Sequence, residues 1–175
     1  DVSFREYCRE RQPDAEWLSK FGNVIFLYSF TKRYGIPGLR MGYIHSSKVI
    51  IRNIRRYSVP WAVNSFAVEA FRYLIFNQAD DFDIEKWLCE KQQFSEEINS
   101  VDGFQCLDSS TPFFLVKLLK GKSADLKHFL LEKGILVRDA SNFFPDGSQY
   151  IRLLTLQADK NRLLINQLKQ WSQQL

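Results

Sequence analysis

The sequence predicts part of an α/β domain followed by a small α+β domain. In the first half, an apolar stretch at 24–30 is followed by a turn rich in glycine and proline, and then by amphipathic segments. In the second half, short apolar strands alternate with helical patterns and lead to an amphipathic closing helix. A polar, acid-rich segment at 77–83 separates the halves. We therefore expect a boundary near Asp80, with one domain over residues 1–80 and another over residues 81–175.

The first domain is expected to present a strand, a loop and a second strand. The strand at 24–30 is apolar throughout, which is typical of a fully buried strand, and a shorter strand is expected at 41–45. A helix should follow at 46–57. Pro60 then breaks the chain before 62–76, which is apolar enough to be a largely buried helix.

The second domain is expected to combine three helices with a sheet. A long helix at about 84–99 precedes strands at 104–107 and 113–119. A helix from Ser123 should bury three residues, Leu126, Phe129 and Leu130, and end at Gly134. Strands are expected at 135–138 and 150–156, and the closing helix carries one apolar stripe made of Leu164, Leu168, Trp171 and Leu175.

Composition excludes several classes of protein. The 175 residues are 45% hydrophobic and contain no apolar run near the roughly 20 residues that cross a bilayer, so we expect no membrane segment. The first residues resemble neither a signal peptide nor a start, so we expect the chain to begin inside a longer protein. Three cysteines (Cys8, Cys89 and Cys106) without CxxC spacing favour a reducing cytoplasm over disulfides, and His45 and His128 lack clustered ligands, so no metal is expected.

The basic residues allow two interpretations. The net charge is +4, and one face of the expected helix at 46–57 carries Lys48, Arg52, Arg55 and Arg56. A nucleic-acid partner would use such a face. The opposite face carries Ile50, Ile54 and Tyr57 at helical spacing, which is the pattern of an ordinary surface helix with solvated charges, and this second interpretation predicts no nucleic acid.

Lys32 is the principal candidate for chemistry. It follows the apolar strand, and two hydroxyls, those of Ser29 and Thr31, stand beside it. At the end of a buried strand its amine would be partly desolvated, which favours the neutral nucleophile needed for a Schiff base with an aldehyde cofactor. Arg40 offers a planar fork suited to phosphate. The structural alternative is that the two hydroxyls only cap or bend the backbone.

Two further arginines lie in the expected strands of the second domain. Arg138 and Arg152 each place a permanent charge in an apolar stretch, so each needs a carboxylate, solvent or an anionic ligand. Asp139 and Asp146 are the local candidates for ion pairs. Spacing alone leaves a structural ion pair and an anion-binding site equally open.

These motifs together resemble a known enzyme family. The run at 29–43 resembles the lysine motif of fold-type I pyridoxal-phosphate (PLP) enzymes of the class I/II aminotransferase superfamily. Residues 36–40 and 60–64 resemble the threonine-phosphate decarboxylase group, and 136–143 with 150–152 resembles a segment that this group shares with histidinol-phosphate aminotransferases. The resemblance covers the C-terminal half of a family chain. It implies the C-terminal part of the PLP-binding large domain followed by the small C-terminal domain.

The resemblance also implies roles for individual residues. Lys32 would carry the cofactor and move protons, and the other cofactor-binding residues would be Asp1, Phe4, Ser29, Thr31 and Arg40. Among these, Asp1 would pair with the ring nitrogen, and Ser29 and Arg40 would hold the phosphate. Arg152 would bind the substrate carboxylate, and Arg138 would help to bind its phosphate end.

The implied reaction is decarboxylation of L-threonine O-3-phosphate to aminopropanol phosphate in cobalamin biosynthesis. Phe4 favours this group, because the aminotransferases carry a tyrosine there, and a histidinol-phosphate or related aminotransferase is the alternative. The substrate would be a phosphorylated amino acid or amino alcohol, and the intact enzyme a homodimer. A non-catalytic fragment or interaction module is a further alternative.

Family patterns differ at Val2 and Ser3, and at Tyr28, where a basic residue is common. The isolated segment is expected to be incomplete and to aggregate, because its apolar surfaces lack partners.

Overall fold

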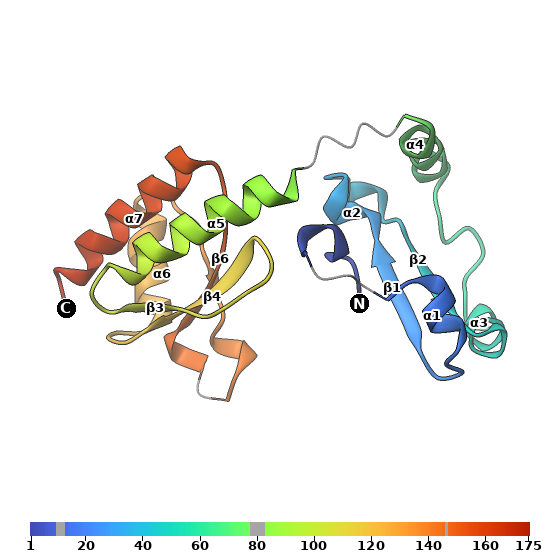
Figure 1. Cartoon of the computed structure of the whole chain (residues 1–175), viewed down its shortest axis with the longest axis horizontal. Helices are drawn as coiled ribbons and strands as arrows, with labels where there is room; N and C mark the ends of the chain where they lie inside the picture. Colours follow the sequence, from blue (N-terminus) through green and yellow to red (C-terminus); the bar gives the residue numbers. More distant parts are fainter. Residues whose placement is uncertain (10–12, 78–82, 146) are drawn as a thin grey trace. The chain divides into compact units, whose positions relative to one another are not determined.

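The computed structural model describes residues 1–9, 13–77, 83–145 and 147–175. It divides into two compact units, Asp1–Phe82 and Asp83–Leu175, which are described separately below (Figure 1). The boundary that the sequence predicts, near Asp80, lies outside the described residues. None of the described helices has the length and apolar character that a bilayer crossing requires.

Unit 1 is built on a pair of antiparallel strands, which confirms the expected strand, loop and strand. β1 (Ile25–Ser29) pairs with β2 (Gly42–Ser46), so that Ser29 lies opposite Gly42. Between them lie a short helix and a 3-10 turn, α2 (Phe30–Arg33) and η2 (Pro37–Leu39). The remaining elements are η1 (Arg5–Tyr7), α1 (Ala15–Ser19), α3 (Lys48–Arg55) and α4 (Ser65–Phe76).

Side-chain caps fix where the helices of unit 1 begin. The Ser47 hydroxyl accepts a hydrogen bond from the Ile50 backbone N–H, and the Asn64 side chain accepts one from Ala67 at 2.9 Å. α4 therefore starts at Ser65, three residues later than the apolar pattern predicts. The four basic residues of the α3 region are exposed, as a solvated face requires, but Tyr57 is exposed as well.

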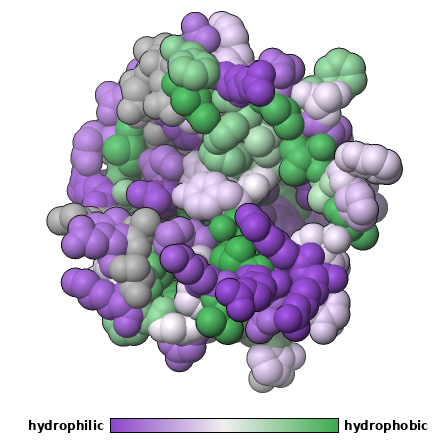
Figure 2. Space-filling model, turned by 90° about the vertical axis from the view of Figure 1, so that its right-hand side faces the viewer, coloured by the Kyte–Doolittle hydropathy of each residue, from purple (hydrophilic) through white to green (hydrophobic). Residues whose placement is uncertain are grey.

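The expected burial of β1 and α4 is wrong within this chain. Leu27 in the middle of β1 is 46% exposed, and Phe66 and Phe76 of α4 are 79% and 83% exposed. Only Ala67 is buried in α4. A two-stranded sheet offers little surface for packing, so apolar side chains stay open on the side where α3 and α4 lie (Figure 2). The apolar pattern is real, but the described residues do not supply a layer that covers it.

Unit 2 contains a four-stranded antiparallel sheet of order β3-β4-β6-β5. Its strands are β3 (Phe104–Cys106), β4 (Phe113–Leu118), β5 (Arg138–Asp139) and β6 (Tyr150–Leu154). Its helices are α5 (Ile84–Asn99), α6 (Ser123–Glu132) and α7 (Ala158–Ser172), and two 3-10 turns, η3 (Ser141–Phe143) and η4 (Gly147–Gln149), join β5 to β6. Both predicted ends of α5 are confirmed.

The core of unit 2 lies between one sheet face and the three helices. Burial alternates along β4, where Phe114, Val116 and Leu118 point inward. They pack in one cluster with residues of all three helices, among them Phe94, Ile98, Leu126, Leu130, Leu164 and Leu168. The predicted small α+β unit with helices on one sheet face is therefore confirmed.

One strand of unit 2 is shorter than its sequence predicts. α6 ends in a Schellman motif: Gly134 has a φ of +73°, its N–H donates to Leu131, and the Ile135 N–H donates to Leu130 at 2.9 Å. The amide of Ile135 is thus occupied by the helix end, and β5 begins only at Arg138. The apolar run at 135–137 is therefore a helix-terminating segment rather than strand.

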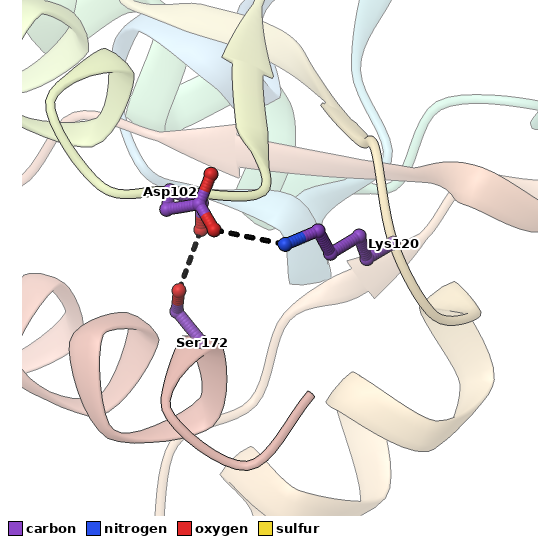
Figure 3. Close-up of polar contacts among 3 residues, drawn as sticks. All are labelled: Asp102, Lys120 and Ser172. Atoms are coloured by element: carbon purple, nitrogen blue, oxygen red, sulfur yellow. Dashed lines mark hydrogen bonds and ion pairs between the residues drawn. The ribbon is translucent and has the colours of Figure 1, made fainter.

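The last helix is tied to the rest of unit 2 at both ends. Near its start the buried Asn161 donates to Glu90 of α5 at 2.8 Å. At its end the Ser172 hydroxyl donates to the backbone carbonyl of Asp102 at 2.7 Å, and the Asp102 carboxylate pairs with Lys120 at 3.0 Å (Figure 3). α7 ends at Ser172, so Leu175 lies beyond the helix and is exposed, in contrast to the expected stripe.

Candidate functional site

Lys32 lies in α2, directly after β1. Its Nζ is 5.6 Å from the centroid of the Phe4 ring, and its backbone carbonyl accepts a hydrogen bond from the Tyr7 hydroxyl at 2.9 Å. The side chain is exposed, so the expected partial desolvation of the amine is wrong for this chain. The reason is the same as for β1, because no described layer covers this end of the strand. The amine is therefore accessible to a ligand, and its backbone is held in place.

Ser29 and Thr31 form a pair of hydroxyls beside this lysine. Their oxygens, Ser29 Oγ and Thr31 Oγ1, are 2.7 Å apart. Ser29 Oγ also accepts from the Thr31 backbone N–H at 3.4 Å and so caps α2. The structural role that the sequence leaves open is thus present. It does not exclude binding, since each hydroxyl keeps further donor or acceptor capacity.

A chain of hydrogen bonds joins Asp1 to the same end of β1. The Asp1 Oδ1 accepts from both the backbone N–H and the hydroxyl of Ser3, at 2.9 and 2.6 Å. The Ser3 hydroxyl in turn accepts from the Ser29 backbone N–H at 3.1 Å. Sequence reasoning missed Ser3, although an Asp two residues before a hydroxyl is a typical turn signal. Ser3 is buried and fixes the Asp1 carboxylate relative to β1.

An open pocket of about 340 Å³ adjoins this cluster. Asp1, Ser3 and Ser29 line it, together with Tyr28 and Tyr43 from the two strands. The Tyr28 ring stacks on Tyr43 with centroids 5.1 Å apart, and its hydroxyl donates to Glu6 at 2.7 Å. Burial, and then the hydrogen bond to Glu6, raise the pKa of Tyr28 far above its ordinary value, so this wall of the pocket stays neutral.

Arg40 is not brought to the hydroxyl pair. It has a left-handed backbone, with φ of 52°, and its guanidinium donates to the Pro37 carbonyl at 3.2 Å. No described contact links it to Ser29 or Thr31. The loop that carries it is held by Asn64, whose amide donates to the Leu39 carbonyl at 3.2 Å while its oxygen caps α4. Asn64 therefore both starts α4 and anchors this loop.

The two arginines of unit 2 lie side by side. Arg138 of β5 is the register partner of Arg152 of β6. Both side chains are exposed, and within the described residues neither forms an ion pair. Arg138 donates to the Asn142 side chain at 3.3 Å, and both guanidinium groups face the ring of Phe143. Neither charge is buried, because side chains alternate between the two faces of a strand and the arginines lie on the face opposite the apolar residues. The free-energy cost of burying a charge therefore does not arise.

Asp139 does not neutralise either arginine. Its carboxylate accepts from the Ser141 backbone N–H at 2.8 Å and from the Ser123 hydroxyl at 2.9 Å. The backbone hydrogen bond from Ser141 is the main cause that lowers the pKa of Asp139 below its ordinary value. The other local candidate, Asp146, lies outside the described residues. A structural ion pair with Asp139 is thus contradicted, and among the described residues no carboxylate pairs with either arginine.

Comparison with known proteins gives a family. The model of the family described as aminotransferase class I and II matches residues 1–168. The crystal structure of an L-threonine-O-3-phosphate decarboxylase from Porphyromonas gingivalis is similar, with a TM-score of 0.93, 35% sequence identity and coverage of 98% of this chain and 53% of that one.

Two histidinol-phosphate aminotransferases are similar as well. One, from a Hydrogenobaculum species, is 31% identical over 159 residues, which are 89% of this chain and 44% of that protein. The other, from Sinorhizobium meliloti, has been solved in complex with pyridoxal-5'-phosphate. It shares the fold at a TM-score of 0.74 and 22% identity, with coverage of 98% of this chain and 47% of that one. The chain spans about half the length of the relatives that it matches.

The donor set of unit 1 fits PLP in kind. It combines an accessible primary amine, a pair of hydroxyls and a fixed carboxylate, all at one end of β1. These groups suit an aldehyde, a phosphate and a protonated ring nitrogen, respectively. Arg40 does not join this set in the structure, because its guanidinium donates to the Pro37 carbonyl.

Proposed function

This chain belongs to the aminotransferase class I and II family, and we propose that it supplies the cofactor lysine and the substrate arginines of a PLP-dependent decarboxylase acting on L-threonine O-3-phosphate. One observation carries the proposal: the hydrogen-bonded series from Asp1 through Ser3 to Ser29 and Thr31, with the Lys32 amine beside it. The similarity to the Porphyromonas gingivalis decarboxylase supports the choice of reaction.

The residues of unit 1 divide the work of holding the cofactor. When bound, PLP supplies an aldehyde that reacts with amines and a protonated ring that accepts an electron pair. Lys32 would hold the aldehyde carbon and later return a proton to Cα. Asp1 would keep the ring nitrogen protonated, because a carboxylate favours the charged form of a nearby base. Ser29 and Thr31 would donate to the phosphate oxygens.

The residues of unit 2 would bind and orient the substrate. Arg152 would form a bidentate pair with the carboxylate, and Arg138 would take the phosphate end. Both are exposed and lack a carboxylate partner within the described residues, which leaves their donors available. By holding the carboxylate, Arg152 would set the direction of the bond from Cα that breaks when carbon dioxide is released.

A histidinol-phosphate aminotransferase is the second candidate, supported by the relative from Hydrogenobaculum. Its substrate also carries a phosphate, so the two arginines do not separate the reactions. Phe4 favours decarboxylation, because it lacks the hydroxyl that a tyrosine at this position in the aminotransferases offers to the ring oxygen of the cofactor. We also propose a cytoplasmic homodimer acting in cobalamin biosynthesis; the absence of a disulfide at Cys8, Cys89 and Cys106 within the described residues is consistent with a reducing compartment.

The test uses the full-length gene product with PLP. Reduction with borohydride followed by peptide mass spectrometry should place the cofactor on Lys32. L-threonine O-3-phosphate should then yield carbon dioxide and aminopropanol phosphate. Transfer of the amino group to 2-oxoglutarate without carbon dioxide would instead select the aminotransferase.

Two variants make this test specific. Lys32→Ala should lose the borohydride adduct and all turnover, whereas Lys48→Ala, at an exposed lysine on α3, should keep both. An adduct on any lysine other than Lys32, or none at all, would contradict the proposal.

A further inference from the structure

Arg138 and Arg152 make an unfavourable neighbour pair in the sheet. They are register partners on β5 and β6, so their side chains project from the same face of an antiparallel ladder. Like charges directly opposite each other repel. The nearest carboxylate in sequence, that of Asp139, is bonded to Ser123 and Ser141 instead. Both side chains are exposed, so water screens part of this repulsion, and within the described residues an uncharged group that contacts both cations would offset more of it.

Phe143 is that group. Its ring centroid lies 5.8 Å from the guanidinium carbon of Arg138 and 5.9 Å from that of Arg152. The face of an aromatic ring is electron-rich and attracts a cation within about 6 Å. A single ring thus contacts both guanidinium groups, while Asn142 accepts a hydrogen bond from Arg138 only.

We propose that Phe143 is a positioning residue that holds the two arginines together as a two-point clamp for a doubly anionic substrate. The ring uses no N–H group of either arginine, so it orients both cations and leaves their hydrogen bonds for the ligand. A molecule with a carboxylate and a phosphate satisfies two forks at once. The identity of this substrate rests on the proposed function, whereas the clamp rests on the contacts of Phe143.

Substitution of the ring tests the clamp. Phe143→Leu keeps an apolar side chain but removes the ring, and Phe143→Trp keeps a ring. Phe144→Leu is the matched control: Phe144 is 42% exposed against 43% for Phe143, and its ring contacts Tyr150 instead of an arginine. With full-length protein we expect Phe143→Leu to weaken binding of L-threonine O-3-phosphate, measured by calorimetry, by about tenfold. Phe143→Trp should restore it, and Phe144→Leu should match the wild type.

Turnover gives a readout that a merely structural role would not move. Phe143→Leu should raise KM by about the same factor without lowering kcat, because the clamp binds the substrate in its ground state and the carboxylate loses its charge as carbon dioxide forms. A double-mutant cycle combines Phe143→Leu with Arg152→Gln, and the unfolding equilibrium constant of each variant is measured without ligand. The effect of the double variant on this constant should differ from the product of the two single effects by about threefold.

The outcomes separate the clamp from the proposed function. Equal binding by the wild type and Phe143→Leu, additive effects in the cycle, or no binding of either L-threonine O-3-phosphate or inorganic phosphate would each overturn the clamp. No adduct at Lys32, with anion binding that still depends on Phe143, would overturn the proposed function and leave the clamp standing.

Discussion

The Asp139 carboxylate accepts hydrogen bonds from two serines instead of forming an ion pair with a nearby arginine. By accepting hydrogen bonds from Ser141 and Ser123 it fixes the turn after β5 and ties this turn to the start of α6. These bonds hold the carboxylate on two serines, and no ion pair between it and Arg138 or Arg152 is formed in the described part of the chain.

The lowered pKa of Asp139 predicts a pH-dependent contribution to stability. Because the pKa of the folded state lies below the ordinary 3.8, the contribution is complete well above pH 4 and is lost as the pH falls through the folded value. Asp139→Asn should lower the free energy of unfolding by about 1 kcal/mol at pH 7, a low figure because the carboxylate is partly open to water. Urea denaturation at pH 7 and pH 3 checks this, and a gap that does not shrink at pH 3 would contradict it.

At the scale of elements, the approach of β2 to β1 is set by Gly42. A Cβ added there would lie 2.3 Å from the Tyr28 carbonyl oxygen, which is backbone and cannot turn away. Gly42→Ala should therefore spread the strand pair and cost about 1–3 kcal/mol in the free energy of unfolding, measured in urea. Gly22→Ala is the control, since nothing lies within 4 Å of its added Cβ. Equal stability of the two variants would show that the strands adjust freely.

Asn161 connects α7 to α5 and to the end of β6. Its side chain is buried, exchanges hydrogen bonds with both backbone groups of Leu156 at 3.0 Å and donates to Glu90 at 2.8 Å. Asn161→Ala should lower the free energy of unfolding by about 2–3 kcal/mol, because buried polar partners lose their bonds. Asn166→Ala, at an exposed position of the same helix, should change it by less than about 0.5 kcal/mol. Thermal unfolding of the two variants distinguishes these results.

The sequence predicts these elements better than it predicts what covers them. Periodicity locates α5 to the residue, and alternation locates β4, because both depend on residues close in the chain. The burial of Leu27 and Phe66 depends on partners that a local pattern does not specify. Motifs bring Ser29, Thr31 and Lys32 together correctly because they are adjacent. Ser3 was missed because its partner, Ser29, lies 26 residues away. Phe143 was missed because its contacts with Arg138 and Arg152 depend on how the turn between β5 and β6 folds.

At the scale of the whole molecule, the hydrophobic core belongs to unit 2. All residues of its core cluster lie between Phe94 and Leu168. In unit 1 the buried hydrophobic residues, among those described, are Leu18, Tyr28 and Ala67. The two units should therefore differ in their ability to fold alone.

Separate expression of the two units tests this difference. Residues 83–175 should give a monomer that melts cooperatively, and residues 1–82 should aggregate, because large apolar side chains are exposed. Sedimentation velocity and calorimetry check both. Phe66→Lys and Phe76→Lys should improve the solubility of residues 1–82, because both side chains are exposed. A monomeric, cooperatively melting 1–82 would contradict the prediction.

The sheet of unit 2 carries its shortest strands on the outside. β3 spans three residues and β5 spans two, and the latter consists of Arg138 and Asp139. An exposed strand edge is a template for pairing with another chain, and short, charged edges prevent such pairing. Arg138 at this edge would therefore have a second benefit that is independent of any ligand. Its charge would keep copies of unit 2 from pairing edge to edge into fibrils.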